Sequence, residues 1–63
     1  MIPDEIRNAR LRKGLTQEAL AQKIGTTAKS VHRWETGKVK PSLLLGHKLE
    51  EVLAIDPRKE QDE

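Results

Sequence analysis

The sequence predicts an all-α domain, a compact bundle of four to five helices. Apolar residues recur at three- and four-residue spacings, and no alternation of apolar and polar residues lasts beyond a few positions. Phe and Tyr, which favour strands, are absent. A chain of 63 residues buries only about 60% of the surface that its unfolded form exposes. We therefore expect helix packing alone to hold the fold, without room for a large enzyme pocket.

The first two helices have recognisable ends. The first covers about residues 3–13, because Pro3 suits a first helical turn and Gly14 can take the left-handed conformation that ends a helix. Thr16 can cap the second helix, and Gly25 ends it. The inward face of this second helix consists of Leu20, Ala21 and Ile24.

Two further helices follow the same rules. Thr27 can cap a third helix that ends at Gly37, after Thr36. Its inward stripe consists of Ser30, Val31 and Trp34. Ser42 can cap a fourth helix to about residue 53, in which Gly46 should loosen the helix or let another backbone approach. The core face of this fourth helix consists of Leu45, Leu49, Val52 and Leu53.

The predicted domain covers residues 1–57, and residues 58–63 form a charged C-terminal tail. Asp56 and Pro57 could begin a fifth helix, but residues 58–63 contain no apolar side chain to anchor one. We therefore expect this tail to be frayed.

Basic side chains are concentrated in the middle of the chain. The net charge is +2, but residues 7–48 hold ten basic and two acidic side chains, a local charge of +8. This distribution suits a polyanionic partner that meets the middle of the chain. On this observation alone, an ordinary solvated surface stays open as the alternative.

Several functional classes are not predicted. The chain has no cysteine, and His32 and His47 have no acidic partner at ligand spacing, so we expect no metal and no cofactor. Ser30 and His32 have no carboxylate to complete a triad, so we expect neither an enzyme nor a small-molecule substrate. The longest apolar run, residues 43–45, is far shorter than the roughly 18 residues of a membrane span, and no leader pattern begins the chain. We expect a cytoplasmic protein without membrane contact.

The second and third helices form a helix-turn-helix pattern. Only Gly25 and Thr26 separate them, and so short a turn makes the two axes cross steeply. Such a crossing needs a small residue where the helices touch, which Ala21 supplies, and a positive φ in the turn, which Gly25 accepts. The wedge between the helices must be apolar, and it consists of Leu20, Ile24, Val31 and Trp34.

From about residue 6 to residue 55, the sequence resembles the helix-turn-helix DNA-binding domains of phage repressor and Cro proteins. The matching pieces are Ile6-Arg7, Arg10, residues 14–18, Leu20-Ala21, residues 25–27, Val31, Trp34-Glu35, Gly37 and Pro41-Ser42. The resemblance implies a bundle of four or five helices, a cytoplasmic location and duplex DNA as the ligand. It also implies a homodimer on a two-fold symmetric DNA site as a common arrangement.

The resemblance also assigns roles by position. It implies a recognition helix at about residues 27–35 that enters the major groove, as in a transcriptional repressor or regulator. The implied phosphate ligands are Gln17, Thr27, Thr36, Lys38 and Lys40. The implied base contacts are Ala28, Lys29 and Arg33.

The residues themselves indicate the same face of the third helix. With its apolar stripe turned inward, the positions left outside are 28, 29, 32, 33 and 36. Lys29 and Arg33 are neighbours one turn apart, and both side chains suit the acceptors O6 and N7 of guanine. We expect His32 on this face to be solvated or near a phosphate, and we also include it among the candidate base contacts. Ala28 can touch a thymine methyl or leave room for Lys29.

Two expectations concern the core. Trp34 is the only aromatic residue and belongs to the inward stripe, so no exposed aromatic platform remains for single-stranded nucleic acid. Arg10 lies one turn after Ile6 on the inward side, and Glu35 adjoins Trp34. We therefore expect an ion pair between Arg10 and Glu35, with ordinary surface charges as the alternative.

Residues 43–45 raise the question of a protein partner. Three consecutive helical residues spread over about 200°, so one leucine is exposed, and we expect it to be Leu44. With Leu43 and Ile55 it could hold another protein. The rival function is therefore a protein-binding module of the same fold, such as an antitoxin or a polymerase-contacting adapter. The same residues with Pro57 offer only a small self-contact, which predicts a weak homodimer formed on DNA.

Overall fold

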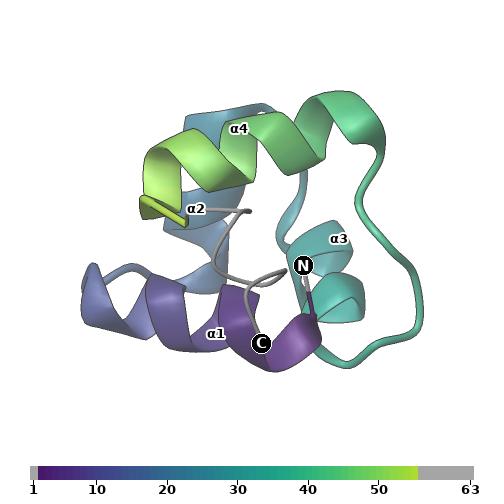
Figure 1. The fold of residues 1–63 in the computed structure, drawn as a ribbon, viewed down its shortest axis with the longest axis horizontal. Helices are drawn as coiled ribbons and strands as arrows, with labels where there is room; N and C mark the ends of the chain where they lie inside the picture. The colour runs from purple at the N-terminus through teal and green to yellow at the C-terminus, as the bar shows by residue number, and fades with distance from the viewer. Residues whose placement is uncertain (1, 56–63) are drawn as a thin grey trace.

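The computed structural model describes residues 2–55 of the chain, and this part consists of four helices (Figure 1). The helices are α1 (Pro3–Arg12), α2 (Gln17–Ile24), α3 (Ala28–Glu35) and α4 (Leu43–Leu53). The described residues contain no strand, so the prediction of an all-α fold is confirmed. The suggested fifth helix at Asp56 and Pro57, and the tail of residues 58–63, lie outside the described residues.

Side-chain caps begin three of the four helices. In α2, α3 and α4, the hydroxyl of the residue before the helix accepts a hydrogen bond from the backbone N–H three residues on, over 3.0, 3.2 and 3.3 Å. The capping residues are Thr16, Thr27 and Ser42. Each cap satisfies one of the backbone donors that a helix N-terminus leaves without an internal partner.

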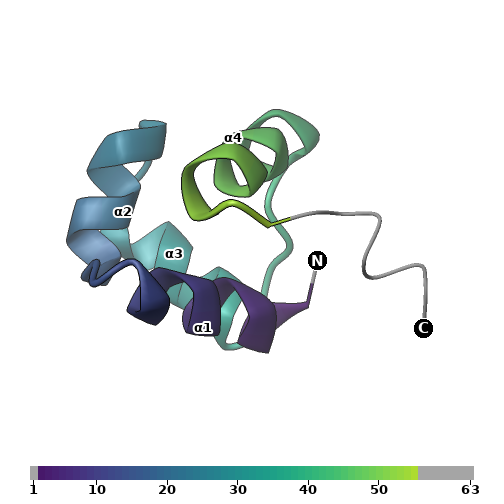
Figure 2. The ribbon, with the colours of Figure 1, turned by 60° about the vertical axis from the view of Figure 1, so that its left-hand side comes forward.

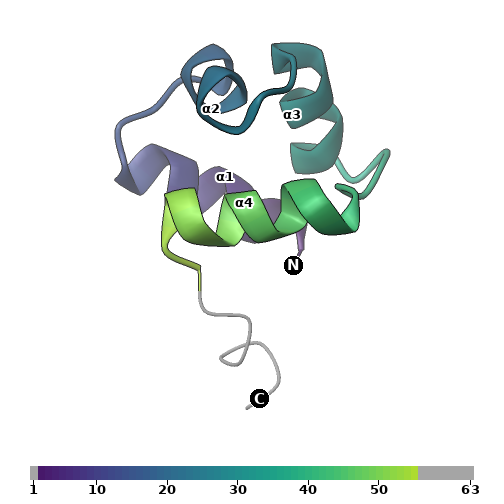
Figure 3. The ribbon, with the colours of Figure 1, turned by 90° about the horizontal axis from the view of Figure 1, so that it is seen from above.

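The four helices close on one another around a single core. α2 packs mainly on α3 and α4, and α1 packs mainly on α3 and α4 as well. Figure 3 shows α2 and α3 next to each other on one side of the bundle, with α1 and α4 on the other. Figure 2 shows that α2 stands across the direction of α1. α3 is therefore held by α1 and α2 on its inner side, and within residues 2–55 no helix packs on its outer side.

The core consists of apolar side chains from all four helices and from Ile55, two residues after the end of α4. The buried apolar residues are Ile6, Ala9, Leu20, Ala21, Ile24, Val31, Trp34, Leu49, Leu53 and Ile55, with Leu15, Leu45 and Val52 partly buried against them. Ser30, which we expected in the inward stripe of α3, is only half-buried. Its hydroxyl oxygen accepts a hydrogen bond from the Thr27 hydroxyl at 3.1 Å. A polar side chain at this edge of the stripe binds its neighbour instead of entering the core.

The exposed leucines at the start of α4 differ from the prediction. Leu43 is 81% exposed and Leu44 is 67% exposed, so two leucines face solvent instead of Leu44 alone. The reason is that α4 begins at Leu43, while the part of α4 that packs on the core begins with Leu45.

Ile55, which we expected on the surface, lies in the core and is 8% exposed. Ala54 ends α4 in the left-handed conformation, with φ of 56°, and this turns the chain back toward the bundle. The backbone N–H of Ile55 then donates to the carbonyl of Glu50 at 3.0 Å. The turn thus carries Ile55 inward, where it cannot serve as a docking residue.

Gly46 lies inside α4, and no other backbone within residues 2–55 approaches it. A Cβ built at this position has no heavy atom within 4 Å, so the predicted close approach is wrong. Glycine in a helix interior costs about 1 kcal/mol relative to alanine. We expect Gly46→Ala to raise the free energy of unfolding by about 0.5 to 1 kcal/mol, measured by urea denaturation.

Gly25→Ala is the matched control for this change. Open space also surrounds a Cβ at Gly25, but its φ is 82°, so alanine there should destabilise the domain by about 1 to 2 kcal/mol. Equal effects of the two substitutions would contradict the interpretation that backbone conformation decides the sign.

Candidate nucleic-acid interface

A tight turn joins α2 to α3 and sets the angle of α3. The backbone N–H groups of Gly25 and Thr26 both donate to the carbonyl of Ala21, each at 2.9 Å. Gly25 adopts the left-handed conformation that the turn requires. Ala21 is buried, and its small side chain lets the two helices approach. This is the helix-turn-helix that the spacing of these residues predicted (Figure 3).

Four of the five positions that we expected on the outer side of α3 and its C-cap are exposed. Lys29, His32, Arg33 and Thr36 are exposed, and Ala28 is half-buried. The inner face carries Val31, Trp34 and Glu35, all buried. The structure thus brings the candidate base contacts together on one face of one helix. Their roles toward DNA remain predictions.

Two of the candidate phosphate ligands use their hydroxyl groups locally. The Thr36 hydroxyl lies 3.0 Å from the carbonyl oxygen of His32 and 3.3 Å from that of Arg33, and it donates to them. Thr27 donates its hydroxyl proton to Ser30 while capping α3. Because a phosphate oxygen only accepts hydrogen bonds, each hydroxyl must turn away from its present partner to bind one.

An ion pair joins the inner sides of α1 and α3. Arg10 donates from Nε to Oε2 of Glu35 at 2.7 Å and from Nη2 to Oε1 at 3.0 Å. Its Nη1 donates to the carbonyl of Leu15 at 2.8 Å. The hydrogen bond to Glu35 raises the pKa of the Arg10 guanidinium above its ordinary value. Burial lowers this pKa and the negative charge of Glu35 raises it, but the net pKa shift is upward. The two side chains are 11% and 3% exposed, so this pair is largely hidden from solvent.

Gln17, a candidate phosphate ligand, is joined to this ion pair. Its amide nitrogen Nε2 donates to Oε1 of Glu35 at 3.2 Å. Gln17 is the first residue of α2, so the bond links the start of that helix to α3. Sequence reasoning missed this contact, because 18 positions separate the two residues and no local pattern pairs them. The bond orients the amide and leaves its other N–H for an outside partner.

The loop between α3 and α4 (residues 36–42), which we call the lysine loop, presents two exposed lysines, Lys38 and Lys40. Hydrogen bonds fix the start of this loop to α3. The backbone N–H groups of Lys38 and Val39 both donate to the carbonyl of Arg33, at 3.0 and 3.4 Å. The lysines are therefore tied to the C-terminal end of α3. This places positive charge at one end of the exposed face.

A family model for helix-turn-helix domains matches residues 6–59. The matched part includes all of α2, α3 and α4 and most of α1. The chain belongs to the helix-turn-helix family of phage repressor and Cro proteins. It is a DNA-binding domain of the kind found in transcriptional regulators.

Two curated relatives of this helix-turn-helix domain come from archaea. A protein of Methanothermobacter thermautotrophicus is 42% identical over 48 residues, which are 76% of this chain and 70% of that protein. A protein of Archaeoglobus fulgidus is 43% identical over 47 residues, which are 75% of this chain and 67% of that protein. Each is named an uncharacterized HTH-type transcriptional regulator. No solved structure matches the chain significantly.

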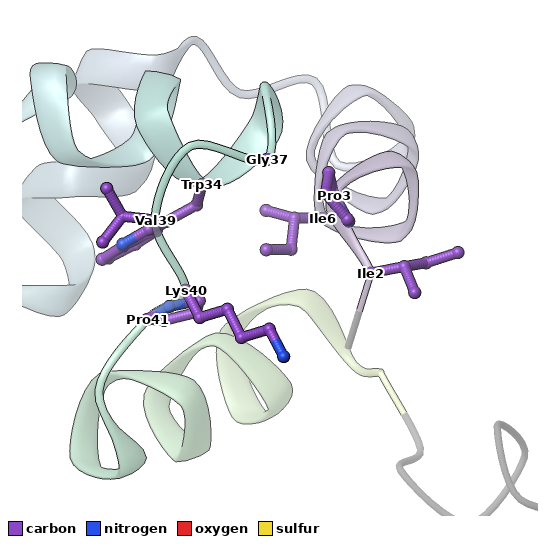
Figure 4. Close-up of a pocket in the computed structure, with 8 residues that line it drawn as sticks. All are labelled: Ile2, Pro3, Ile6, Trp34, Gly37, Val39, Lys40 and Pro41. Carbon is purple, nitrogen blue, oxygen red and sulfur yellow. The ribbon is translucent and has the colours of Figure 1, made fainter.

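The lysine loop of this domain packs beside an apolar groove of about 330 Å³ (Figure 4). The groove lies between the start of α1 and the loop, and the residues that line it are Ile2, Pro3, Ile6, Trp34, Gly37, Val39, Lys40 and Pro41. Trp34 is buried here, while Val39 stays exposed. The indole of Trp34 and the side chain of Lys40 thus line the same groove.

Residues 2–55 hold neither a cluster of metal ligands nor a membrane-spanning helix. No three His, Asp or Glu side chains in this range come together as a metal would require. None of the four helices is long and apolar enough to cross a membrane.

Proposed function

We propose that this domain binds duplex DNA in a sequence-specific way, with α3 in the major groove, as part of a transcriptional repressor or regulator. The observation that carries the proposal is the charge on the outer face of α3. Lys29 and Arg33 are exposed there, and the lysine loop continues the positive charge. Between Glu18 and Glu50 the only acidic residue is Glu35, and it is buried against Arg10. A surface so free of exposed carboxylates attracts phosphates.

The proposed contacts fall into two groups. Base edges are contacted from the outer face of α3, by Ala28, Lys29, His32 and Arg33. Phosphates are contacted around it, by Gln17, Thr27, Thr36, Lys38 and Lys40. Phosphate contacts position a protein on the duplex, whereas base contacts carry sequence information, so the two groups should respond differently to mutation.

We expect Lys38→Ala and Lys40→Ala each to weaken binding to every duplex sequence. Each lysine that neutralises a phosphate releases counterions, so its loss should flatten the slope of log K against log salt by about one unit. Fluorescence anisotropy with a random-sequence duplex at several salt concentrations measures this slope.

Lys23→Ala is the control for these two variants, because Lys23 lines a different hollow, with Lys13, Leu15 and Val52. Its loss should leave the slope unchanged. A flat salt dependence of the parent protein would contradict the proposed function. It would favour the rival, a protein-binding module such as an antitoxin or a polymerase-contacting adapter.

We also propose that two copies pair on DNA through the start of α4. Leu43 and Leu44 are exposed side by side there, but Ile55 is buried, so the patch is smaller than the sequence suggested. A specific interface usually buries at least about 1,000 Å² in total. This patch falls short of that area, so DNA must supply the remaining affinity.

The free protein should therefore sediment as a 7.1 kDa monomer at micromolar concentration. Two copies should bind cooperatively to half-sites about one helical turn, ~34 Å, apart. Leu44→Glu should abolish cooperativity and spare the affinity for one half-site, whereas Leu11→Glu, at an exposed position of α1, should change neither. A stable dimer without DNA, or independent binding of the two copies, would show this assembly to be wrong.

A further inference from the structure

The outer face of α3 offers hydrogen-bond donors to a base but very few acceptors. Its two long side chains, Lys29 and Arg33, carry donors only. Both are exposed, and within residues 2–55 neither side chain has a hydrogen bond or an ion pair. Their donors are therefore free to bind an external group.

The hydrogen-bond acceptors of the α3 side chains are mostly buried or already bound to other residues of the domain. Its one carboxylate, Glu35, is 8% exposed, and its oxygens accept from Arg10 and Gln17. The Ser30 hydroxyl oxygen accepts from Thr27. The helix contains no Asn, Gln or Asp. Among the exposed side chains of α3 itself, only an imidazole nitrogen of His32 can still accept.

This imbalance discriminates between bases. In the major groove, guanine presents two acceptors, O6 and N7, whereas adenine and cytosine each present an amino group that needs an acceptor. Thymine presents a single acceptor, O4, beside its methyl group, so it offers a lysine or arginine fewer hydrogen bonds than guanine does. A lysine or arginine opposite such an amino group leaves donors facing each other. A donor that loses its water without gaining a partner weakens binding.

We propose that Lys29 and Arg33 restrict base recognition to guanine, and that each half-site contains two guanines within three consecutive base pairs. The two residues lie four positions apart, about 6 Å along the helix axis. Base pairs rise by about 3.4 Å, so 6 Å spans fewer than two steps. This inference rests on the proposed function, because it assumes that α3 enters the major groove.

The first experiment selects bound sequences from a random duplex library and then replaces single bases in the selected site. 7-Deazaguanine lacks the N7 acceptor but still pairs with cytosine. It should weaken binding about 5-fold or more at each of the two guanines, within the range for one good base contact. 7-Deazaadenine, the matched control, should change affinity less than about 2-fold at adenines in the same site. The proposal would be overturned by a selected site that lacks two guanines within three consecutive base pairs. An equal loss of affinity with both analogues would overturn it as well.

The second experiment replaces one of the two residues proposed to contact guanine. Arg33→Gln supplies an acceptor and a donor, the arrangement that binds adenine N6 and N7. The variant should prefer adenine to guanine at one position about 5-fold or more, while the other guanine stays required. Lys23→Ala, at an exposed position of α2 outside the proposed contacts, should leave both guanine preferences intact. Retention of guanine at both positions by Arg33→Gln would overturn the assignment.

These outcomes separate the inference from the function beneath it. If the parent protein binds no duplex at all, the proposed function fails. If a defined sequence is enriched and 7-deazaguanine has no effect, the function stands and only the guanine assignment is wrong. Circular dichroism of each variant checks folding, which should be unchanged because Arg33 and Lys23 are exposed.

Discussion

Replacing Glu35 by glutamine is expected to lower the free energy of unfolding by about 3 to 5 kcal/mol, the usual cost of removing one member of a buried ion pair. The substitution leaves the buried Arg10 guanidinium without its counter-charge, although its bond to the Leu15 carbonyl remains. At roughly 0.05 to 0.15 kcal/mol per residue, the whole domain holds on the order of 3 to 9 kcal/mol. The variant should therefore be partly or wholly unfolded at room temperature.

A stabilised background keeps this measurement possible. Gly46→Ala should add stability at a position remote from the pair in sequence, so each variant is best compared in that background. Trp34 is buried and is the only aromatic residue, so its fluorescence reports unfolding directly. Glu51→Gln makes the same chemical change at an exposed position of α4 and should cost less than about 0.5 kcal/mol.

A double-mutant cycle then isolates the interaction itself. Arg10→Met should also destabilise strongly, because it leaves the Glu35 carboxylate buried with only Gln17 as a partner. The double variant should be less unstable than the two single losses added together, by about 0.5 to 3 kcal/mol. Additive losses would mean that the two side chains do not interact in solution.

The helices were predictable because local residues mark their ends. Thr16, Thr27 and Ser42 stand where hydroxyl caps were expected, and Gly25 takes the left-handed conformation that the turn demands. These signals act within three or four positions, so one sequence is enough to detect them. The inward and outward faces of α3 follow from the same helical period.

The features that the sequence did not reveal depend on contacts between distant residues or on side-chain orientation. The bond from Gln17 to Glu35 needs α2 and α3 at their final crossing. The burial of Ile55 depends on the left-handed turn at Ala54, a residue that seldom adopts this conformation. The inward bond of the Thr36 hydroxyl reflects a rotamer, which spacing does not determine.

Replacing both Lys29 and Arg33 by alanine is expected to produce the largest loss of DNA recognition. Each good base contact contributes about 1 to 3 kcal/mol of discrimination, so the double variant should bind the preferred site about 2 to 6 kcal/mol more weakly. The single variants should each lose about 1 to 3 kcal/mol and relax the preference at one base pair. Neither side chain supports the fold, since both are exposed and unpaired within residues 2–55.

The measurement compares the preferred site with a random duplex in the same buffer. If the two residues contact bases, the double variant should lose most of the ratio between these affinities and keep much of its salt-dependent binding to random DNA, because Lys38 and Lys40 remain. The double variant Lys38→Ala with Lys40→Ala is the reciprocal control: its affinity should fall on both duplexes while the ratio stays high. An equal loss on every sequence after removal of Lys29 and Arg33 would make them phosphate ligands, and base recognition would then have to come from Ala28, His32 or the shape of the DNA.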